Sequence, residues 1–179
     1  MILLVFPCLL VTLLALWWFP SFFWKNDPAR RNWFGKFLFW VNGPLYYFLI
    51  GPSFFPQPPL QFRFLTWPGY ILAIYGLVVT LLTLKPKIKA GGAGYEPTQL
   101  ITHGIFSHLR HPQLAGAFYI SLGFSLSQNA LYHLYLSFIY LAIFAIHVWM
   151  EEKYLLIPLF GDEYLAYRKK TKAFFFGIL

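Results

Sequence analysis

Charged side chains are scarce in this 179-residue chain: they make up 11% of the residues, whereas 59% are hydrophobic. A soluble domain carries about a quarter charged residues, which is enough to coat its surface. Acidic residues are especially rare, with 6 Asp and Glu against 14 Lys and Arg. The composition therefore excludes an ordinary water-soluble domain.

Potential metal ligands and nucleotide loops are also lacking. Cys8 is the single cysteine and lies in an apolar run, so it supports neither a disulfide framework nor a thiolate metal site. The 5 histidines are too few for the histidine boxes of a di-iron oxygenase, and their spacing does not select haem ligation. The glycine-rich segment 91–94 follows no predicted strand, so we expect a hinge rather than a Rossmann phosphate loop. We expect no metal site.

The sequence contains long runs without Asp, Glu, Lys or Arg. A helix needs about 20 apolar residues to cross a bilayer. The longest run, residues 112–150, exceeds one crossing and contains the polar turn Ser127-Gln128-Asn129, which divides it. The first run has no basic segment before it and no small-x-small site after it, so we expect a retained span rather than a secretory signal. We predict an all-α integral membrane helical bundle, a single domain over residues 1–179, with five transmembrane helices at 2–24, 36–52, 64–84, 112–127 and 131–150.

The basic residues fall on one side of this predicted arrangement. Every Lys and Arg except Arg63 lies between the first and second spans, between the third and fourth, or after the fifth. Cytoplasmic loops carry such an excess, which predicts an extracytoplasmic N-terminus and a cytoplasmic C-terminus and active site. The net charge of +8 is therefore explained by topology, and we expect no nucleic-acid partner.

Two polar segments remain for chemistry, because the span interiors hold no ionisable group beyond His133 and His147. One is the predicted cytoplasmic loop 85–111. The other is the tail from Glu151, whose charged and apolar residues alternate as in an amphipathic helix lying on a membrane surface.

Each polar segment carries one suggestive motif beside a span. Arg110-His111-Pro112 precedes the fourth span, where proline suits a first helical turn and the free amides attract a carboxylate or phosphate. Alone, this motif is also typical of a basic headgroup anchor. Glu151-Glu152 ends the fifth span, where paired carboxylates oppose the helix dipole and require a cation. That cation is either Arg110 across the hairpin or a ligand, although His147, four residues before Glu151, is a local alternative.

The short connection between the fourth and fifth spans makes the two helices antiparallel, so the two motifs are predicted to meet in one site. The residues that accompany them are Leu100 to Phe106, Gly116, Phe160-Gly161-Asp162-Glu163-Tyr164 and Tyr167-Arg168. Taken together and in this order, the motifs resemble the signature of isoprenylcysteine carboxyl methyltransferases and related phospholipid methyltransferases. The resemblance covers residues 85–172.

The resemblance implies an S-adenosyl-L-methionine-dependent methyltransferase without a Rossmann domain, acting on a lipophilic small-molecule or lipidated substrate within membrane lipids. It implies Arg110 and Glu152 as catalytic residues. The cofactor-binding residues that it implies are Gln99, Leu100, Ile101, Phe106, His111, Pro112, Gln113, Leu114 and Glu152. Methyl transfer from a sulfonium is helped mainly by positioning and by excluding water.

Three positions depart from the family pattern. Phe106 and Leu114 stand where the family prefers tyrosine, and Val148 stands where the isoprenylcysteine enzymes have an arginine for the substrate carboxylate. His147 beside it is the candidate substrate residue. These departures keep open a non-catalytic structural protein of the same fold. A nicotinamide-dependent membrane reductase, which shares the C-terminal architecture, is less favoured because no motif indicates it.

Overall fold

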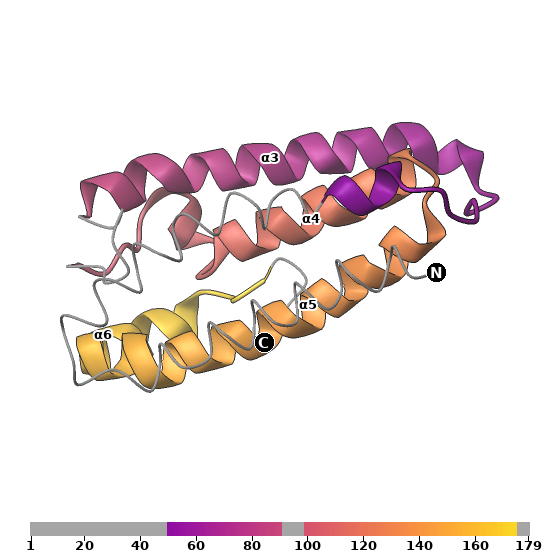
Figure 1. Cartoon of the computed structure of the whole chain (residues 1–179). Coiled ribbons are helices and arrows are strands. Elements are labelled where there is room, and N and C mark those ends of the chain that lie inside the picture. The colour runs from indigo at the N-terminus through magenta and orange to yellow at the C-terminus, as the bar shows by residue number, and fades with distance from the viewer. Residues whose placement is uncertain (1–49, 91–98, 175–179) are drawn as a thin grey trace.

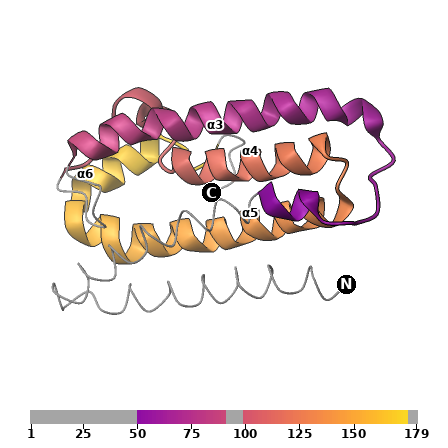
Figure 2. The ribbon, with the colours of Figure 1, turned by 45° about the horizontal axis from the view of Figure 1, so that its top comes forward.

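The computed structural model describes residues 50–90 and 99–174, and within these ranges the regular structure is helical, with isolated β-bridges only. The long helices are α3 (Thr66–Lys89), α4 (Pro112–Ser127) and α5 (Leu131–Glu151), and the shorter α6 (Ile157–Lys170) lies at the end of the bundle where α5 ends (Figures 1 and 2). Three short 3-10 segments accompany them: η1 (Gly51–Phe54), η2 (Arg63–Leu65) and η3 (Gly104–Ser107). The predicted helical class is confirmed for these residues. The predicted span 2–24 and nearly all of 36–52 lie outside them, so the count of five spans stays a prediction.

The α4–α5 hairpin follows the predicted boundaries closely. Pro112 occupies the first turn of α4, and α4 ends at Ser127. Asn129 then adopts a left-handed conformation (φ 56°), which asparagine tolerates better than most residues. The amide of Ala130 closes the turn by donating to the carbonyl oxygen of Ser125 at 2.8 Å. This tight turn brings the start of α4 and the end of α5 to the same end of the bundle.

Helix α3 is longer than predicted. It runs to Lys89 with Pro86 inside its last turns, so the predicted start of the loop at residue 85 is wrong. The prediction ended the span at residue 84 because the uncharged run stops before Lys85, and the proline costs the helix one hydrogen bond. The helix continues nonetheless: the amide of Ala90 donates to the carbonyl oxygen of Pro86 at 3.0 Å, and Lys87 Nζ donates to Gln113 Oε1 of α4 at 2.5 Å.

Glycines allow α3 and α4 to pack backbone against backbone. A Cβ atom added to Gly76 of α3 would lie 2.6 Å from the carbonyl oxygen of Gly116 on α4. One added to Gly123 of α4 would lie 2.4 Å from the backbone nitrogen of Ala73. Membrane helices use small residues for such close approach, because lipid offers no hydrophobic drive for association.

Two segments, Arg63–Lys87 and Leu131–Trp149, are long and apolar enough to cross a bilayer, judged by length and composition. Their outer faces carry large exposed apolar side chains, among them Trp67, Ile71, Ile74, Phe138 and Ile146. Such surfaces suit contact with lipid or with other apolar helices.

The buried histidine near the start of α5 is satisfied by hydrogen bonds. His133 is 0% exposed, and its two ring nitrogens bond to the hydroxyl of Ser53 and to Ser121 Oγ (3.1 Å). Its backbone amide donates to Gln57 Oε1 at 3.0 Å. These bonds tie the segment before α3 to the α4–α5 hairpin, which is a structural role.

The tail begins with a π-helical turn, η4 (Glu152–Leu156), and continues as α6. Gly161 interrupts α6 with a positive φ of 54°. Beyond this break Tyr164 and Tyr167 face inward, whereas Arg168, Lys169 and Lys170 are exposed. After α6 the chain returns to the first motif, where the amide of Arg110 donates to the carbonyl oxygen of Lys172 at 2.8 Å.

Candidate functional site

The two motifs meet as predicted. Arg110 Nε donates to Glu152 Oε1 at 2.8 Å, and the side chains are 6% and 4% exposed. The guanidinium of Arg110 also donates to the carbonyl oxygens of Arg168, at 3.2 Å, and of Thr171. Arg168 approaches the second oxygen of Glu152 from the solvent side, with Nε 3.1 Å from Oε2. Glu152 is therefore the point where the start of α4, the end of α5 and the tail are joined.

His111 lies between the two carboxylates. Its Nδ1 is 3.2 Å from Glu151 Oε2, and its Nε2 is 3.2 Å from Glu152 Oε1. Ionised carboxylates only accept hydrogen bonds, so both ring nitrogens must carry a proton. Burial alone would lower the pKa of His111, but its hydrogen bonds to Glu151 and Glu152 and their charges outweigh burial and raise the pKa above 6.5. His111 is thus held as an imidazolium.

Both carboxylates are held ionised. Burial would raise the pKa of Glu152, but hydrogen bonds from His111 and Arg110, with their charges, lower it to about 2. Burial likewise opposes ionisation of Glu151, yet hydrogen bonds from His111 and His147 hold its pKa well below 4.5. His147 Nε2 lies 3.2 Å from Glu151 Oε2, so the local pair considered from the sequence also exists. Groups with such low pKa values are poor proton acceptors near neutral pH.

Two buried tyrosines of α6 complete the cluster. Tyr164 is 1% exposed, and burial, followed by the charge of Glu152, raises the pKa of its hydroxyl above the usual range. The Tyr167 hydroxyl donates to the carbonyl oxygen of Phe106 at 2.5 Å, and burial raises its pKa to about 12. Tyr167 therefore fixes the η3 turn against α6.

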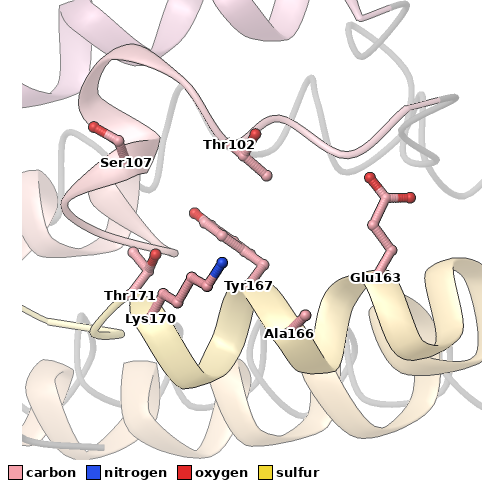
Figure 3. Close-up of a pocket in the computed structure, with 7 residues that line it drawn as sticks. All are labelled: Thr102, Ser107, Glu163, Ala166, Tyr167, Lys170 and Thr171. Atoms are coloured by element: carbon pink, nitrogen blue, oxygen red, sulfur yellow. The ribbon is translucent and has the colours of Figure 1, made fainter.

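A hollow of about 400 Å³ lies between the segment before α4 and α6 (Figure 3). Glu163 stands on one side of it and Lys170 on the other, with Tyr167 between them. The residues that line it are Thr102, Ser107, Glu163, Ala166, Tyr167, Lys170 and Thr171. The sequence-predicted residues Ile101 and Phe106 directly precede two of these residues but do not line the hollow.

The remaining predicted site residues are distributed around the ionic cluster. Phe106 is the buried residue of η3, and Leu114 packs on the apolar core formed by α4 and α5. Gln113 faces α3 and accepts the hydrogen bond from Lys87. Gln99, Leu100 and Ile101 lie outside regular secondary structure and are at least partly exposed.

Sequence reasoning missed the roles of Lys87, Tyr167 and Arg168. Tyr167 and Arg168 belong to the tail motif, which was the available signal, but the motif does not show that Tyr167 bonds to Phe106 and Arg168 to Glu152. Lys87 carried no signal, because residue 85 was taken as the start of a loop.

A known protein family matches the part of the chain that carries most of this cluster. The family described as phospholipid methyltransferase matches residues 64–163, which is more than half of the chain and includes α3, α4, α5 and most of the ionic cluster. The chain belongs to the phospholipid methyltransferase family. It is thus a member of a family of membrane methyltransferases, as the motifs predicted.

Two known proteins are similar to this chain over part of their lengths. The protein-S-isoprenylcysteine O-methyltransferase of Schizosaccharomyces pombe (strain 972) is 39% identical over 73 residues, which cover 40% of this chain and 30% of that protein. The solved structure of the eukaryotic intramembrane Ras methyltransferase, an isoprenylcysteine carboxyl methyltransferase, matches with a TM-score of 0.53 at 22% identity. That match covers 86% of this chain and 53% of the other, so the chain spans about half the length of its solved relative. The likeness shows a shared fold.

Proposed function

We propose that this chain is an integral membrane methyltransferase that transfers the methyl group of S-adenosyl-L-methionine to a lipophilic acceptor at the cytoplasmic end of its helices. The observation that carries the proposal is the buried cluster of Arg110, His111 and Glu152, which joins the family motifs in space. When bound, the cofactor supplies an electrophilic methyl group on a sulfonium.

The residues around the start of α4 fit such a cofactor. The N-cap residue His111 makes no side-chain capping hydrogen bond, so the first turn of α4 presents a positive helix end suited to the cofactor carboxylate. Phe106 offers a buried aromatic ring suited to a sulfonium. In this proposal Gln99 to Ile101, Phe106, His111 to Leu114 and Glu152 hold the cofactor.

Arg110 and Glu152 support the proposed cofactor site mainly by fixing the relative positions of the helices around it. Glu152 is already bonded to Arg110, His111 and Arg168, so it holds α4, α5 and α6 in register. Its negative charge also favours a cation nearby. A rigid frame that excludes water is what methyl transfer from a sulfonium requires.

The protonation states of the cluster favour an acceptor that needs no general base. His111 already carries both protons, Glu151 and Glu152 have depressed pKa values, and the tyrosines keep theirs. A carboxylate acceptor meets this condition. With the cofactor bound, such a carboxylate would take the methyl group as an ester while the sulfonium left as a neutral thioether, and no proton would have to be removed. We therefore propose a lipophilic carboxylate, such as an S-isoprenylcysteine, with its reactive head near His147.

Calorimetric titration with S-adenosylhomocysteine tests the cofactor assignment. The wild-type protein in lipid nanodiscs is expected to bind it, and Glu152→Gln is expected to bind at least tenfold more weakly, because the cluster then loses its central charge. Asp162→Asn, which changes an exposed acid of α6, is the matched control and should bind as wild type does. Absence of binding to the folded wild type would favour the non-catalytic alternative.

A further inference from the structure

Lys87 is a cation that turns toward the bundle. It stands in the last turn of α3, at the end of a segment apolar and long enough to cross a membrane, and its side chain is half-buried. A lysine at such a position usually extends its ammonium to water, as the exposed Lys85 does two residues earlier. Lys87 Nζ donates instead to Gln113 Oε1 at 2.5 Å. The side chain therefore crosses from α3 to the first turn of α4.

This position places Lys87 on the α3 side of the ionic cluster. Burial disfavours the charged form of Lys87, whereas the carboxylate of Glu151 attracts its ammonium, and the charge of Lys87 also acts on His147. Arg110 and Arg168 bind Glu152 on the α6 side of the same cluster. Lys87 thus adds a second cation, beside His111, whose charge acts on the part of α5 that carries His147 and Glu151.

The described residues of the cluster carry more positive than negative charge. The carboxylates are Glu151 and Glu152, and the cations are Arg110, His111, Arg168 and Lys87. Buried or half-buried charge is costly unless it is balanced by an opposite charge. The methyl donor of the proposed function carries a sulfonium, an ammonium and one carboxylate, so its binding increases the excess. Among the described residues, an anionic acceptor would reduce this excess.

We propose that Lys87, supported by Gln113, forms a binding site for the ionised carboxylate of the acceptor, beside His147. This inference rests on the proposed function and adds to it a residue that determines acceptor specificity. Gln113 takes one of the three hydrogens of the Lys87 ammonium, and the acceptor carboxylate takes another. Lys87 holds the oxygen that does not react, which leaves the other oxygen directed at the methyl group.

Binding of the acceptor carboxylate by Lys87 would favour release of the methylated product. Methylation converts the carboxylate into a neutral ester, so the ion pair with Lys87 is lost in the reaction itself. The product is therefore bound more weakly than the acceptor, and Lys87 is the source of the difference.

The experiment compares two probes that differ only in charge. The full chain in nanodiscs of neutral lipid, saturated with S-adenosylhomocysteine, is titrated with N-acetyl-S-farnesylcysteine and with its methyl ester. Wild type is expected to bind the carboxylate roughly tenfold or more tightly than the ester, the range of a hydrogen bond to a charged group. Lys87→Met should bind the carboxylate and the ester about equally, because only its affinity for the carboxylate falls. Lys87→Arg should keep most of the wild-type preference.

Lys85→Met removes an exposed charge of the same helix and should preserve the wild-type preference. The affinity for S-adenosylhomocysteine, measured on every variant, should stay unchanged and reports that the protein is folded. The inference is overturned if wild type binds carboxylate and ester equally, or if Lys87→Met and Lys87→Gln both keep the preference. Failure of the wild type to bind S-adenosylhomocysteine would instead overturn the proposed function, and this inference with it.

Discussion

Arg110 Nε and Glu152 Oε1 lie 2.8 Å apart although 42 positions separate the two residues in the chain. This bond joins the first residues before α4 to the first residue after α5, and both side chains are buried. The α4–α5 hairpin makes the contact possible, and the tail completes it through Arg168 and Thr171. The family motifs are thus parts of one ionic cluster.

Arg110→Met is expected to destabilise the protein by about 3 kcal/mol, because it leaves the buried carboxylate of Glu152 with fewer partners. Thermal unfolding in detergent micelles, followed by circular dichroism, measures the loss. The double variant Arg110→Met/Glu152→Met should recover part of it, since the buried carboxylate that Arg110 had neutralised is removed as well. Lys169→Gln, at an exposed position of α6, should unfold as wild type does. Equal stability of Arg110→Met and wild type would show that the pair contributes nothing.

His111 is expected to titrate above its ordinary pKa of 6.5, because its hydrogen bonds to the two carboxylates and their charges outweigh burial, which lowers its pKa. A raised folded-state pKa gives stability that is fully present below pH 6.5 and is lost as the pH rises through the folded value. Nuclear magnetic resonance of histidine ring carbons in nanodiscs should show a midpoint above 6.5 for His111. Its absence in His111→Gln assigns the signal. A midpoint at or below 6.5 would refute the imidazolium assignment.

Gly123→Leu is expected to separate α3 from α4, because even a Cβ at this position would lie 2.4 Å from the backbone nitrogen of Ala73. Overpacking of this kind costs about 1–3 kcal/mol. Thermal unfolding should fall accordingly, whereas Ala142→Leu, at an exposed position of α5, should be neutral. An unchanged unfolding temperature for Gly123→Leu would mean that the two helices are not in contact there.

Uncharged runs and the distribution of basic residues predicted much of this structure. Uncharged runs and the turn at Ser127-Gln128-Asn129 placed α4 and α5 within about a residue of their observed ends. The same hairpin predicted the meeting of Arg110 with Glu152. Local rules sufficed here because bilayer thickness and backbone hydrogen bonding leave few alternatives.

The end of α3 and the details of the cluster required tertiary structure. Pro86 and the lysines around it were predicted to lie in a loop. In the structure α3 continues through them, and Lys87 bonds to Gln113 of α4. The bridging of Glu151 and Glu152 by His111 depends on rotations about α4 and α5 that no sequence pattern specifies. The protonation states, and with them the argument for a carboxylate acceptor, follow from that geometry. Val148 alone had pointed away from such an acceptor.

Tyr167→Phe is expected to loosen the η3 turn, because the hydroxyl no longer donates to the carbonyl oxygen of Phe106. The loss is about 1 kcal/mol of stability, and binding of S-adenosylhomocysteine should weaken several-fold because Phe106 shifts. Calorimetry and thermal unfolding test both effects. Tyr135→Phe, on the exposed face of α5, is the control. If only stability changes, η3 does not contact the cofactor.

The most direct test of the central claim is transfer of a radiolabelled methyl group from S-adenosyl-L-methionine to N-acetyl-S-farnesylcysteine by the purified protein in nanodiscs. We expect a farnesylated product whose label is released by mild base, as a methyl ester requires, and loss of transfer in Glu152→Gln with Asp162→Asn active. A base-stable product in added phospholipid would show that the acceptor is an amine and contradict the carboxylate assignment. No transfer to the probe or to any membrane lipid by a protein that binds S-adenosylhomocysteine would contradict the enzyme itself.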